Sequence, residues 1–550
     1  MQPGPRRAIV TFSRKHVTPP PPALNPSATP LPFRDALFAM LGIGLVNMLV
    51  ALDQTVVSTA LPSIVGELQG FQFYAWIASA YLLASVVTVP VFGRLGDYFG
   101  RKRFVIAAVL VFTGASVLCG LATDMRMLAI ARALQGIGGG MMVGTAFASI
   151  PDLFPDPHAR VRWQVVMAAA YGIGTAAGPS LGGWLSQHFG WRSTFFVNLP
   201  VGALALYFIW RHLPYYRRER QGAVKIDWTG ALLVALVLGG FQTLIEALPK
   251  DGLTTGNLAL AGAVAVLAAA LLICERRATH PIVPLDLFRD PQLVTLFTLS
   301  TLSGFVMFSL IFFAPLLLQG GFGLSPQAAG LLATPIAACI AIGSVINTRI
   351  VVRLPRPTLV LTIGYSLLVA ASAALAFATP RTPHLWLEIA MSAVGIGLGF
   401  ILNNLNIFAQ EIAGRDRLGI TTALLQSTRM VGGMLGTSIL ATIVTHSYAS
   451  GVSDALQTLG PKVATQWLPR LSDPRVLVDA NLREAMLGEL HAAGLDGGAL
   501  VDATRRVLVH ALHIGIAIAG CAALCAVYLV KRIAHIRFRR AATAPNRQAA

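Results

Sequence analysis

Asp53 and Arg132 each interrupt a long apolar stretch of this chain. A charged residue costs ~2.5–3.5 kcal/mol at the centre of a membrane helix, so such residues are usually paired or functional. At ~1.5 Å per residue, Asp53 lies ~10 Å and Arg132 ~8 Å from the outer ends of two antiparallel predicted helices. Because they share a depth, the two side chains could pair across a cavity.

Two kinds of chemistry fit this pair. Burial favours the neutral form of an acid, whereas a nearby guanidinium favours the carboxylate. A carboxylate balanced between these influences can take up and release a proton when its access to water changes. The alternative is a static ion pair that holds two helices together, and the residue types alone leave both interpretations open.

Further polar residues lie within apolar stretches. Arg429 lies about eleven residues inside its stretch and should face a cavity or a partner. Asn403, Asn404 and Asn406 make part of another stretch polar, although interhelical hydrogen bonding explains them equally well. We expect four residues to line a substrate path: Gln54, Asn198, Asn403 and Arg429.

Small residues recur at helical spacing in two stretches. Such ridges let helix backbones approach closely, which would seal a pathway or simply pack two helices. Pro179 should also bend its helix near the outer end, because proline removes a backbone donor. The glycines of the two ridges are Gly136, Gly140 and Gly144 in one stretch and Gly174, Gly178 and Gly182 in the other.

The elements that must position these residues are about fourteen apolar stretches, each near the ~20 residues that a membrane-spanning helix needs. With 55% hydrophobic and 12% charged residues, the chain is predicted to be an all-α integral membrane protein. The predicted spans are 36–59, 73–92, 104–121, 127–150, 163–186, 193–210, 227–247, 257–274, 291–318, 326–348, 358–379, 384–408, 418–445 and 507–530.

The chain has a net charge of +18, and the distribution of its basic residues indicates its membrane topology. With the N-terminus inside, cytoplasmic segments hold 30 of the 42 Lys and Arg residues, whereas the short outer loops hold four. This asymmetry is the positive-inside rule, so we expect both termini in the cytoplasm and no nucleic-acid partner. The lipid bilayer is the expected surrounding of the chain.

Five regions are predicted. Residues 1–35 form a proline-rich disordered tail, 36–210 a six-helix bundle, 211–290 a basic loop with two extra helices and a linker, 291–530 a second six-helix bundle, and 531–550 a basic tail. The outer segment 447–506 contains two amphipathic patterns, at 455–468 and 474–490. We expect it to be a flexible loop, with docking of an envelope partner as the alternative.

Taken together, several motifs resemble those of the major facilitator superfamily, and within it the fourteen-helix drug:proton antiporters. The resemblance covers residues 36–445 well and the last span by position only. It implies a fold of two six-helix bundles plus two extra central helices. The motifs are L-D-Q-T-V-V-S-T-A-L-P from Leu52, G-R-L-G-D-Y-F-G-R-K-R from Gly93, R-A-L-Q-G-I-G-G-G from Arg132, A-A-G-P-S-L-G-G-W-L from Ala176, W-R-S-T-F-F-V-N-L-P-V-G from Trp191 and L-L-Q-G-G-F-G-L-S-P-Q-A-A-G from Leu317.

The resemblance also implies roles for individual residues. Asp53 would be the protonation site and Arg132 its modulator. An inner-loop latch would consist of Gly93, Asp97, Gly100 and Arg101, with Asp97 approaching the positive N-terminal end of the helix near Gly419. The motif typical of antiporters would comprise Gly174, Gly178, Pro179, Gly182 and Gly183.

The predicted function is proton-coupled export of small amphipathic molecules, or multidrug efflux, by alternating access in the bacterial cytoplasmic membrane. The partners would be a small-molecule substrate and protons. Alternatives are a dedicated exporter of one metabolite, such as a siderophore or antibiotic, and a transport-dead receptor or scaffold. No nucleophile elbow, metal-site motif or Walker motif occurs in the sequence, so we expect neither an enzyme nor a cofactor or metal.

Overall fold

Helices make up every regular element that the computed structural model describes. The described residues are 32–68, 70, 73–154, 157–215, 227–278, 281–282, 285–351, 354, 356–413, 418–457, 461–472, 475–478, 480–493 and 495–533. The predicted tails 1–35 and 531–550 therefore lie almost entirely outside them.

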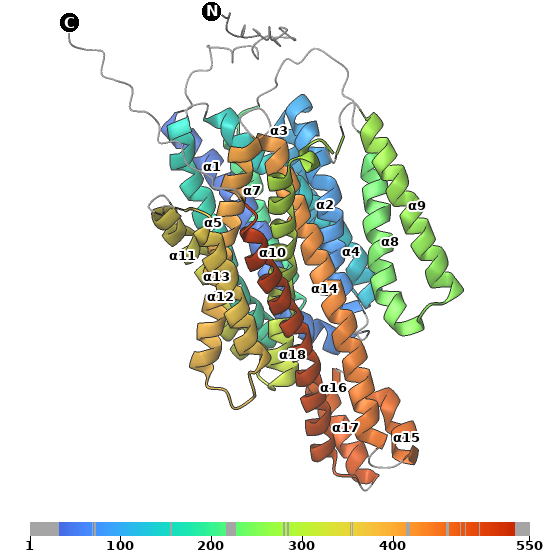
Figure 1. Ribbon diagram of the computed structural model, residues 1–550. Helices are drawn as coiled ribbons and strands as arrows, with labels where there is room; N and C mark the ends of the chain where they lie inside the picture. Colours follow the sequence, from blue (N-terminus) through green and yellow to red (C-terminus); the bar gives the residue numbers. More distant parts are fainter. Residues whose placement is uncertain are drawn as a thin grey trace, which may run out of the picture.

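The first half of the chain forms one group of helices, here called the N-terminal bundle (Figure 1). Its members are α1 (Phe33–Leu68), α2 (Tyr74–Phe99), α3 (Arg101–Gly120), α4 (Met125–Leu153), α5 (Pro157–Phe189), α6 (Ser193–Phe196) and α7 (Asn198–His212). Two further helices follow, α8 (Trp228–Asp251) and α9 (Thr255–Arg277), and then the short η2 (Leu287–Arg289).

The second half forms the C-terminal bundle and an outer cap, the name used here for residues 447–506. The bundle contains α10 (Pro291–Leu316), the π-helical turn η3 (Leu317–Gly321), α11 (Pro326–Val351), α12 (Leu359–Ala376), α13 (His384–Ala413), α14 (Leu418–Gln457) and α18 (Gly497–Val530). The cap adds α15 (Pro461–Leu471), α16 (Arg475–Val478) and α17 (Ala480–Ala492) to the adjoining ends of α14 and α18.

The two bundles use the same pairing pattern. In the N-terminal bundle α1 packs on α5 and α7, α2 on α4, and α3 on α4 and α7. In the C-terminal bundle α10 packs on α14 and α18, α11 on α13, and α12 on α13 and α18. The bundles meet where α5 packs on α11 and α2 on α14. The two halves of the chain therefore repeat one arrangement of helices, as in many secondary transporters.

Thirteen helices in the described residues are long and apolar enough to cross a membrane. The stretch predicted at 163–186 lies in α5, which has 33 residues but is not among those thirteen. Several helices are longer than their predicted spans; α1, for example, continues to Leu68 instead of ending at residue 59. Its last two turns contain the polar Ser63 and Glu67, so hydropathy marks only the apolar part of the helix.

The helices α8 and α9 form a hairpin at the side of the bundles (Figure 1). Only 6% of the most apolar window of α9 is buried, as expected for a surface that faces lipid. A polar contact between described residues joins the hairpin to the N-terminal bundle: the buried Gln242 side chain of α8 donates a hydrogen bond to the Ser79 hydroxyl of α2.

The outer cap corrects the expectation of a flexible loop. The cap is helical and extends beyond the bundles at the bottom of Figure 1. Trp467, Leu471 and Leu490 are buried in it, and the Tyr448 hydroxyl donates a 2.9 Å hydrogen bond to the Leu471 carbonyl oxygen. The predicted amphipathic patterns fall on α15 and α17, with different bounds. α15 packs on α14, and α17 packs on α16 and α18, which stabilises the segment as a folded unit.

Candidate functional site

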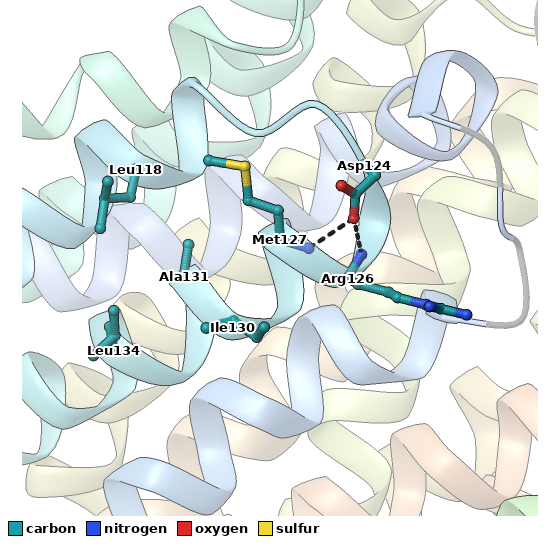
Figure 2. Close-up of a pocket in the computed structure, with 7 residues that line it drawn as sticks. All are labelled: Leu118, Asp124, Arg126, Met127, Ile130, Ala131 and Leu134. Atoms are coloured by element: carbon teal, nitrogen blue, oxygen red, sulfur yellow. Dashed lines mark hydrogen bonds between the residues drawn. The ribbon is translucent and has the colours of Figure 1, made fainter.

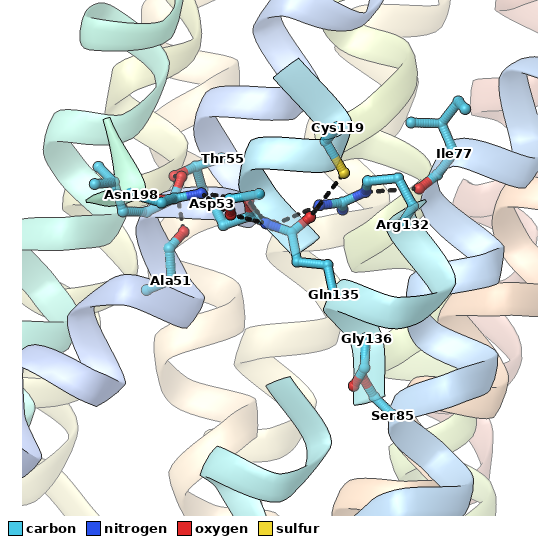
Figure 3. Close-up of polar contacts among 12 residues, drawn as sticks. Ala51, Asp53, Thr55, Ile77, Ser85, Cys119, Arg132, Gln135, Gly136 and Asn198 are labelled. Atoms are coloured by element: carbon cyan, nitrogen blue, oxygen red, sulfur yellow. Dashed lines mark hydrogen bonds and ion pairs between the residues drawn. The ribbon is translucent and has the colours of Figure 1, made fainter. Parts of the chain in front are cut away.

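Asp53 of α1 and Arg132 of α4 form an ion pair inside the N-terminal bundle (Figure 3). The Arg132 Nη1 atom lies 2.6 Å from Asp53 Oδ2, and both residues are fully buried. The predicted pairing of these two residues is therefore present. Because each charge has left water, the free energy of the pair depends on the other hydrogen bonds that the two groups make.

Gln135 is a residue of the site that the sequence interpretation missed. Its side-chain oxygen accepts a 2.5 Å hydrogen bond from Arg132 Nη1, and its Nε2 donates a 2.7 Å bond to Asp53 Oδ1. The side chain thus bridges the two charges (Figure 3). The available signal was spacing, because Gln135 follows Arg132 by three positions and lies on the same face of the helix.

Asn198 brings a third helix to the carboxylate. Its Nδ2 donates a 2.9 Å hydrogen bond to Asp53 Oδ1 and a 3.1 Å bond to the Ser116 hydroxyl of α3. Ser116 also accepts a 2.6 Å bond from Gln135. Asp53 therefore accepts hydrogen bonds from Arg132, Gln135 and Asn198, which together compensate for its burial. In this conformation the Asn198 side chain is fully buried in the network.

The Arg132 guanidinium is also held by α2. Its Nε donates a 3.1 Å hydrogen bond to the Ile77 carbonyl oxygen, and its Cζ lies 4.7 Å from the centre of the Tyr81 ring. A cation over an aromatic face gains electrostatic attraction without a second acid. The network consequently joins α1, α2, α3, α4 and α7. A change in the charge of Asp53 would alter hydrogen bonds that connect these five helices.

An interruption of the predicted helix places Asn198 at the start of α7. The predicted span 193–210 is divided into α6 and α7, and Pro200 is tolerated in the first turn of α7 because that turn needs no internal N–H donor there. Upstream, Trp191 Nε1 donates a 2.9 Å bond to Glu67, which also pairs with Arg192. These contacts attach the α6–α7 segment to the outer end of α1.

The glycines predicted as an antiporter motif face two different partners. A methyl group at Gly174 would lie 2.8 Å from the Met48 carbonyl oxygen of α1, and one at Gly182 would lie 2.6 Å from that of Val56. The α1–α5 contact thus excludes side chains along this ridge. The ridge also includes Gly178, which faces Thr55 of α1.

The remaining residues of this motif face the C-terminal bundle. Gly183 lies against the Pro326 carbonyl group of α11, and Gly330 of α11 lies against the Pro179 carbonyl group. The backbones of α5 and α11 are therefore nearly in contact at the end of the bundles that the charge distribution predicts to face outside, called the outer end below.

On α4, the predicted glycine ridge packs against α2. Methyl groups at Gly140 and Gly144 would lie 2.8 Å from the Ser85 carbonyl oxygen and 2.5 Å from that of Val89, respectively. Ser85 reinforces this contact, because its hydroxyl donates a 2.9 Å hydrogen bond to the Gly136 carbonyl oxygen (Figure 3).

Part of the predicted latch is described. Gly100 has φ +88°, a conformation that favours glycine, and its N–H donates to the Gly96 carbonyl oxygen where α2 ends. Gly93 lies against the Gly144 carbonyl group of α4, and Arg101 packs beside Gly96. The side chain of Asp97 lies outside the described residues. Its helix α2 does pack on α14, which begins at Leu418.

The other residues predicted to line a path occupy different surroundings. Gln54, Asn403 and Arg429 are each partly exposed within the described structure. The Arg429 Nε has no hydrogen-bond partner among the described residues. The neighbouring Asn404 instead makes an interhelical bond of 2.7 Å to Asn347 of α11, which is the alternative anticipated for the asparagines.

An apolar groove of about 360 Å³ lies at the outer end between α3 and α4 (Figure 2). Its lining includes the exposed side chains of Leu118, Ile130 and Leu134, as expected where the surface meets lipid. Asp124 at its edge accepts 2.9 Å hydrogen bonds from the N–H groups of Arg126 and Met127 and so caps α4. The groove is separate from the buried network.

Comparison with known proteins gives a consistent result. The family model of the Major Facilitator Superfamily matches residues 43–437. The multidrug transporter protein MdtP of Bacillus subtilis (strain 168) is 34% identical over 421 residues, which are 74% of this chain and 75% of that protein. Multidrug resistance protein 3 of the same organism is 31% identical over 81% of this chain and 87% of its own.

Solved structures resemble the arrangement of helices. A bacterial homolog of the human lysosomal transporter Spinster, in an inward-facing and unoccupied conformation, has a TM-score of 0.56 and 18% sequence identity. The match covers 93% of this chain and 100% of that one. At this identity the likeness concerns the fold alone.

Proposed function

Because the chain belongs to the major facilitator superfamily, a family of membrane transporters, we propose that it exports small amphipathic molecules in exchange for protons by alternating access. It is a multi-pass protein of the bacterial cytoplasmic membrane. The relatives named as multidrug transporter and multidrug resistance proteins support a substrate range of several hydrophobic compounds.

The observation that carries this proposal is the buried carboxylate of Asp53 with its three donors. In its charged form the carboxylate holds Arg132 and the Gln135 and Asn198 amides. A proton on the carboxyl group would cancel its charge and weaken its attraction for Arg132. Uptake of one proton can therefore loosen α1 from α4 and α7, and its release can tighten them.

Alternating access links this change to the two faces of the membrane. We assign the α5–α11 contact at Gly183 and Gly330 to closure of the outer end, and the Gly93–Arg101 segment to closure of the inner end. Each charge that crosses with the membrane potential contributes ~2.3 kcal/mol per 100 mV, which can drive a substrate against its gradient. The outer cap lies on the side to which substrate would be released.

The test is transport in proteoliposomes with an imposed pH gradient. Wild type and Asp53→Asn would be compared on a panel of lipophilic cations and neutral drugs. Gradient-dependent flux in wild type, and its loss in Asp53→Asn with substrate binding retained, is the expected result. Wild-type flux that is indifferent to the pH gradient would contradict proton coupling. Flux of only one member of the panel would indicate a dedicated exporter instead of a multidrug transporter.

A further inference from the structure

The side-chain carboxamide of Asn198 makes hydrogen bonds through its nitrogen but not through its oxygen in the described structure. Its Nδ2 donates hydrogen bonds to Asp53 and Ser116, whereas its Oδ1 is buried and has no hydrogen-bond partner among the described residues. A buried polar atom without a partner costs ~1–3 kcal/mol, so its presence beside a carboxylate calls for an explanation.

The other polar oxygens around Asp53 are already occupied. Gln135 Oε1 accepts from Arg132 and from the Cys119 thiol, at 2.5 Å and 3.6 Å. The Ser116 hydroxyl oxygen accepts from both Gln135 and Asn198, which uses its two lone pairs. Asn198 Oδ1 is thus the side-chain oxygen of this network with unused acceptor capacity.

A protonated Asp53 would need such an acceptor. The carboxylate accepts hydrogen bonds only, but the carboxylic acid gains one O–H donor that must be satisfied inside the protein. A half-turn of the carboxamide exchanges the positions of its Nδ2 and Oδ1 atoms. The O–H group of Asp53 could then donate to Asn198 Oδ1 in place of the N–H bond that Asp53 accepts at present.

We propose that Asn198 is a positioning residue that senses the protonation state of Asp53, donating to the carboxylate and accepting from the carboxylic acid. The proton forms a covalent bond with Asp53 Oδ1, and no other covalent bond is made or broken. The same half-turn places Oδ1 where Nδ2 now faces Ser116, so the bond between α7 and α3 changes from one that Asn198 donates to one that the Ser116 hydroxyl can donate. Protonation would in this way change how α7 is attached to its neighbours.

The other charged or titratable groups near Asp53 come from three helices. Arg132 of α4 pairs with it directly, and Tyr81 of α2 and Cys119 of α3 interact with it electrostatically. Arg132, Tyr81 and Cys119 do not provide a free acceptor next to Asp53 Oδ1. Acceptance of a hydrogen bond from the acid O–H group therefore distinguishes the role of Asn198 from theirs.

This inference rests on the proposed function, because it requires Asp53 to take up a proton. The test is the infrared difference spectrum of the reconstituted full chain, acidic minus neutral. The carboxylic C=O band of Asp53 is identified by its absence in Asp53→Asn. In Asn198→Leu we expect this band at a higher wavenumber, because an O–H group without an acceptor leaves the carbonyl bond stronger. Ser116→Ala is the matched control and should leave the band in place.

The outcomes separate the two ideas. If wild type shows no carboxylic band that Asp53→Asn removes, proton uptake by Asp53 is wrong and the proposed function loses its main support. If the band is present but Asn198→Leu does not move it, or if Ser116→Ala moves it instead, the role of Asn198 alone is wrong.

A second measurement does not require that Asn198→Leu folds. Wild-type chain containing asparagine with a ¹³C-labelled side-chain carbonyl should show an isotope-shifted carboxamide band in the same difference spectrum. That band should be missing in labelled Asp53→Asn. A wild-type spectrum in which no asparagine band changes upon acidification would overturn the proposal.

Discussion

The Gln319 side chain donates a 2.8 Å hydrogen bond to the main-chain carbonyl oxygen of Thr59, so the π-helical turn of the C-terminal bundle holds α1 of the N-terminal bundle. A second bond of the same kind joins the Tyr74 hydroxyl of α2 to the Phe312 carbonyl oxygen of α10, at 2.7 Å. Both bonds are buried and lie at the outer end. The π-helical turn is a local departure from the α-helix of a kind that is frequent at functional sites.

Gln319→Leu should weaken this closure. The substitution keeps the apolar volume and removes one buried hydrogen bond between the bundles, worth ~0.5–1.5 kcal/mol net, or about a two- to tenfold shift toward outward-open states. The shift can be measured with Ser180→Cys, at the contact between Ser180 and Thr334, as faster modification by a membrane-impermeant maleimide added from outside. The native cysteines would be replaced by alanine.

The matched control is Gln457→Leu. Gln457 lies exposed at the end of α14, and its hydrogen bond of 3.3 Å to Ser453 stays within one helix. This variant should leave the rate of modification unchanged. Equal rates in wild type and Gln319→Leu would mean that the bond to Thr59 does not contribute to closure.

Gly178→Ala should destabilise the chain. Its new methyl group would meet the Thr55 side chain of α1, and overpacking of this kind costs ~1–3 kcal/mol. Gly114→Ala in α3 is the control, because a methyl group there would meet nothing within 4 Å. Thermal unfolding in detergent should show a lower Tm for Gly178→Ala only. A similar Tm for both variants would contradict close packing of α1 on α5.

Arg132→Met should be strongly destabilising at neutral pH. It leaves the buried Asp53 carboxylate without its counter-charge, and breaking a buried pair in this way costs ~3–5 kcal/mol. Acidic pH should relieve much of this cost, because a protonated Asp53 carries no charge. Thermal unfolding of Arg132→Met, measured from neutral to acidic pH, checks the direction of the change.

The double variant Arg132→Met with Asp53→Asn completes a double-mutant cycle. It should recover most of the stability lost in Arg132→Met, since the charge that lacked a partner is gone. The 2.6 Å separation indicates that the two side chains interact. If the stability changes of the two single variants simply add in the double variant, this interaction is contradicted.

Leu477→Ala should loosen the outer cap. Leu477 is 1% exposed in α16, which packs against α1, η3 and α18 and so bridges both bundles. Truncation of a buried leucine costs ~2–5 kcal/mol. We expect protease cleavage within 447–506 to become faster while the transmembrane core remains intact. Leu482→Ala, at a more exposed position of α17, is the comparison and should change the cleavage rate little.

The sequence was sufficient to predict the pair of Asp53 and Arg132, because the cost of a charge in the membrane and the depth of a residue on a helix both follow from position along the chain. It was not sufficient for Gln135, Ser116 and Asn198 as one network with Asp53. Their meeting depends on the rotation of α3, α4 and α7 about their own axes. The same holds for Asn404, whose bond to Asn347 could not be distinguished from a place on the substrate path.

Long apolar stretches, the inside excess of arginine and the glycine ridges are local properties, and they determined that this chain is helical, crosses the membrane many times and packs some helices backbone to backbone. Only the tertiary structure decided which glycines face α1 and which face α11, and that the outer cap is folded. The physical reason is that hydropathy depends on each residue and its neighbours in sequence. Packing of Leu477, or an acceptor beside Asp53, depends on side chains that come from distant parts of the chain.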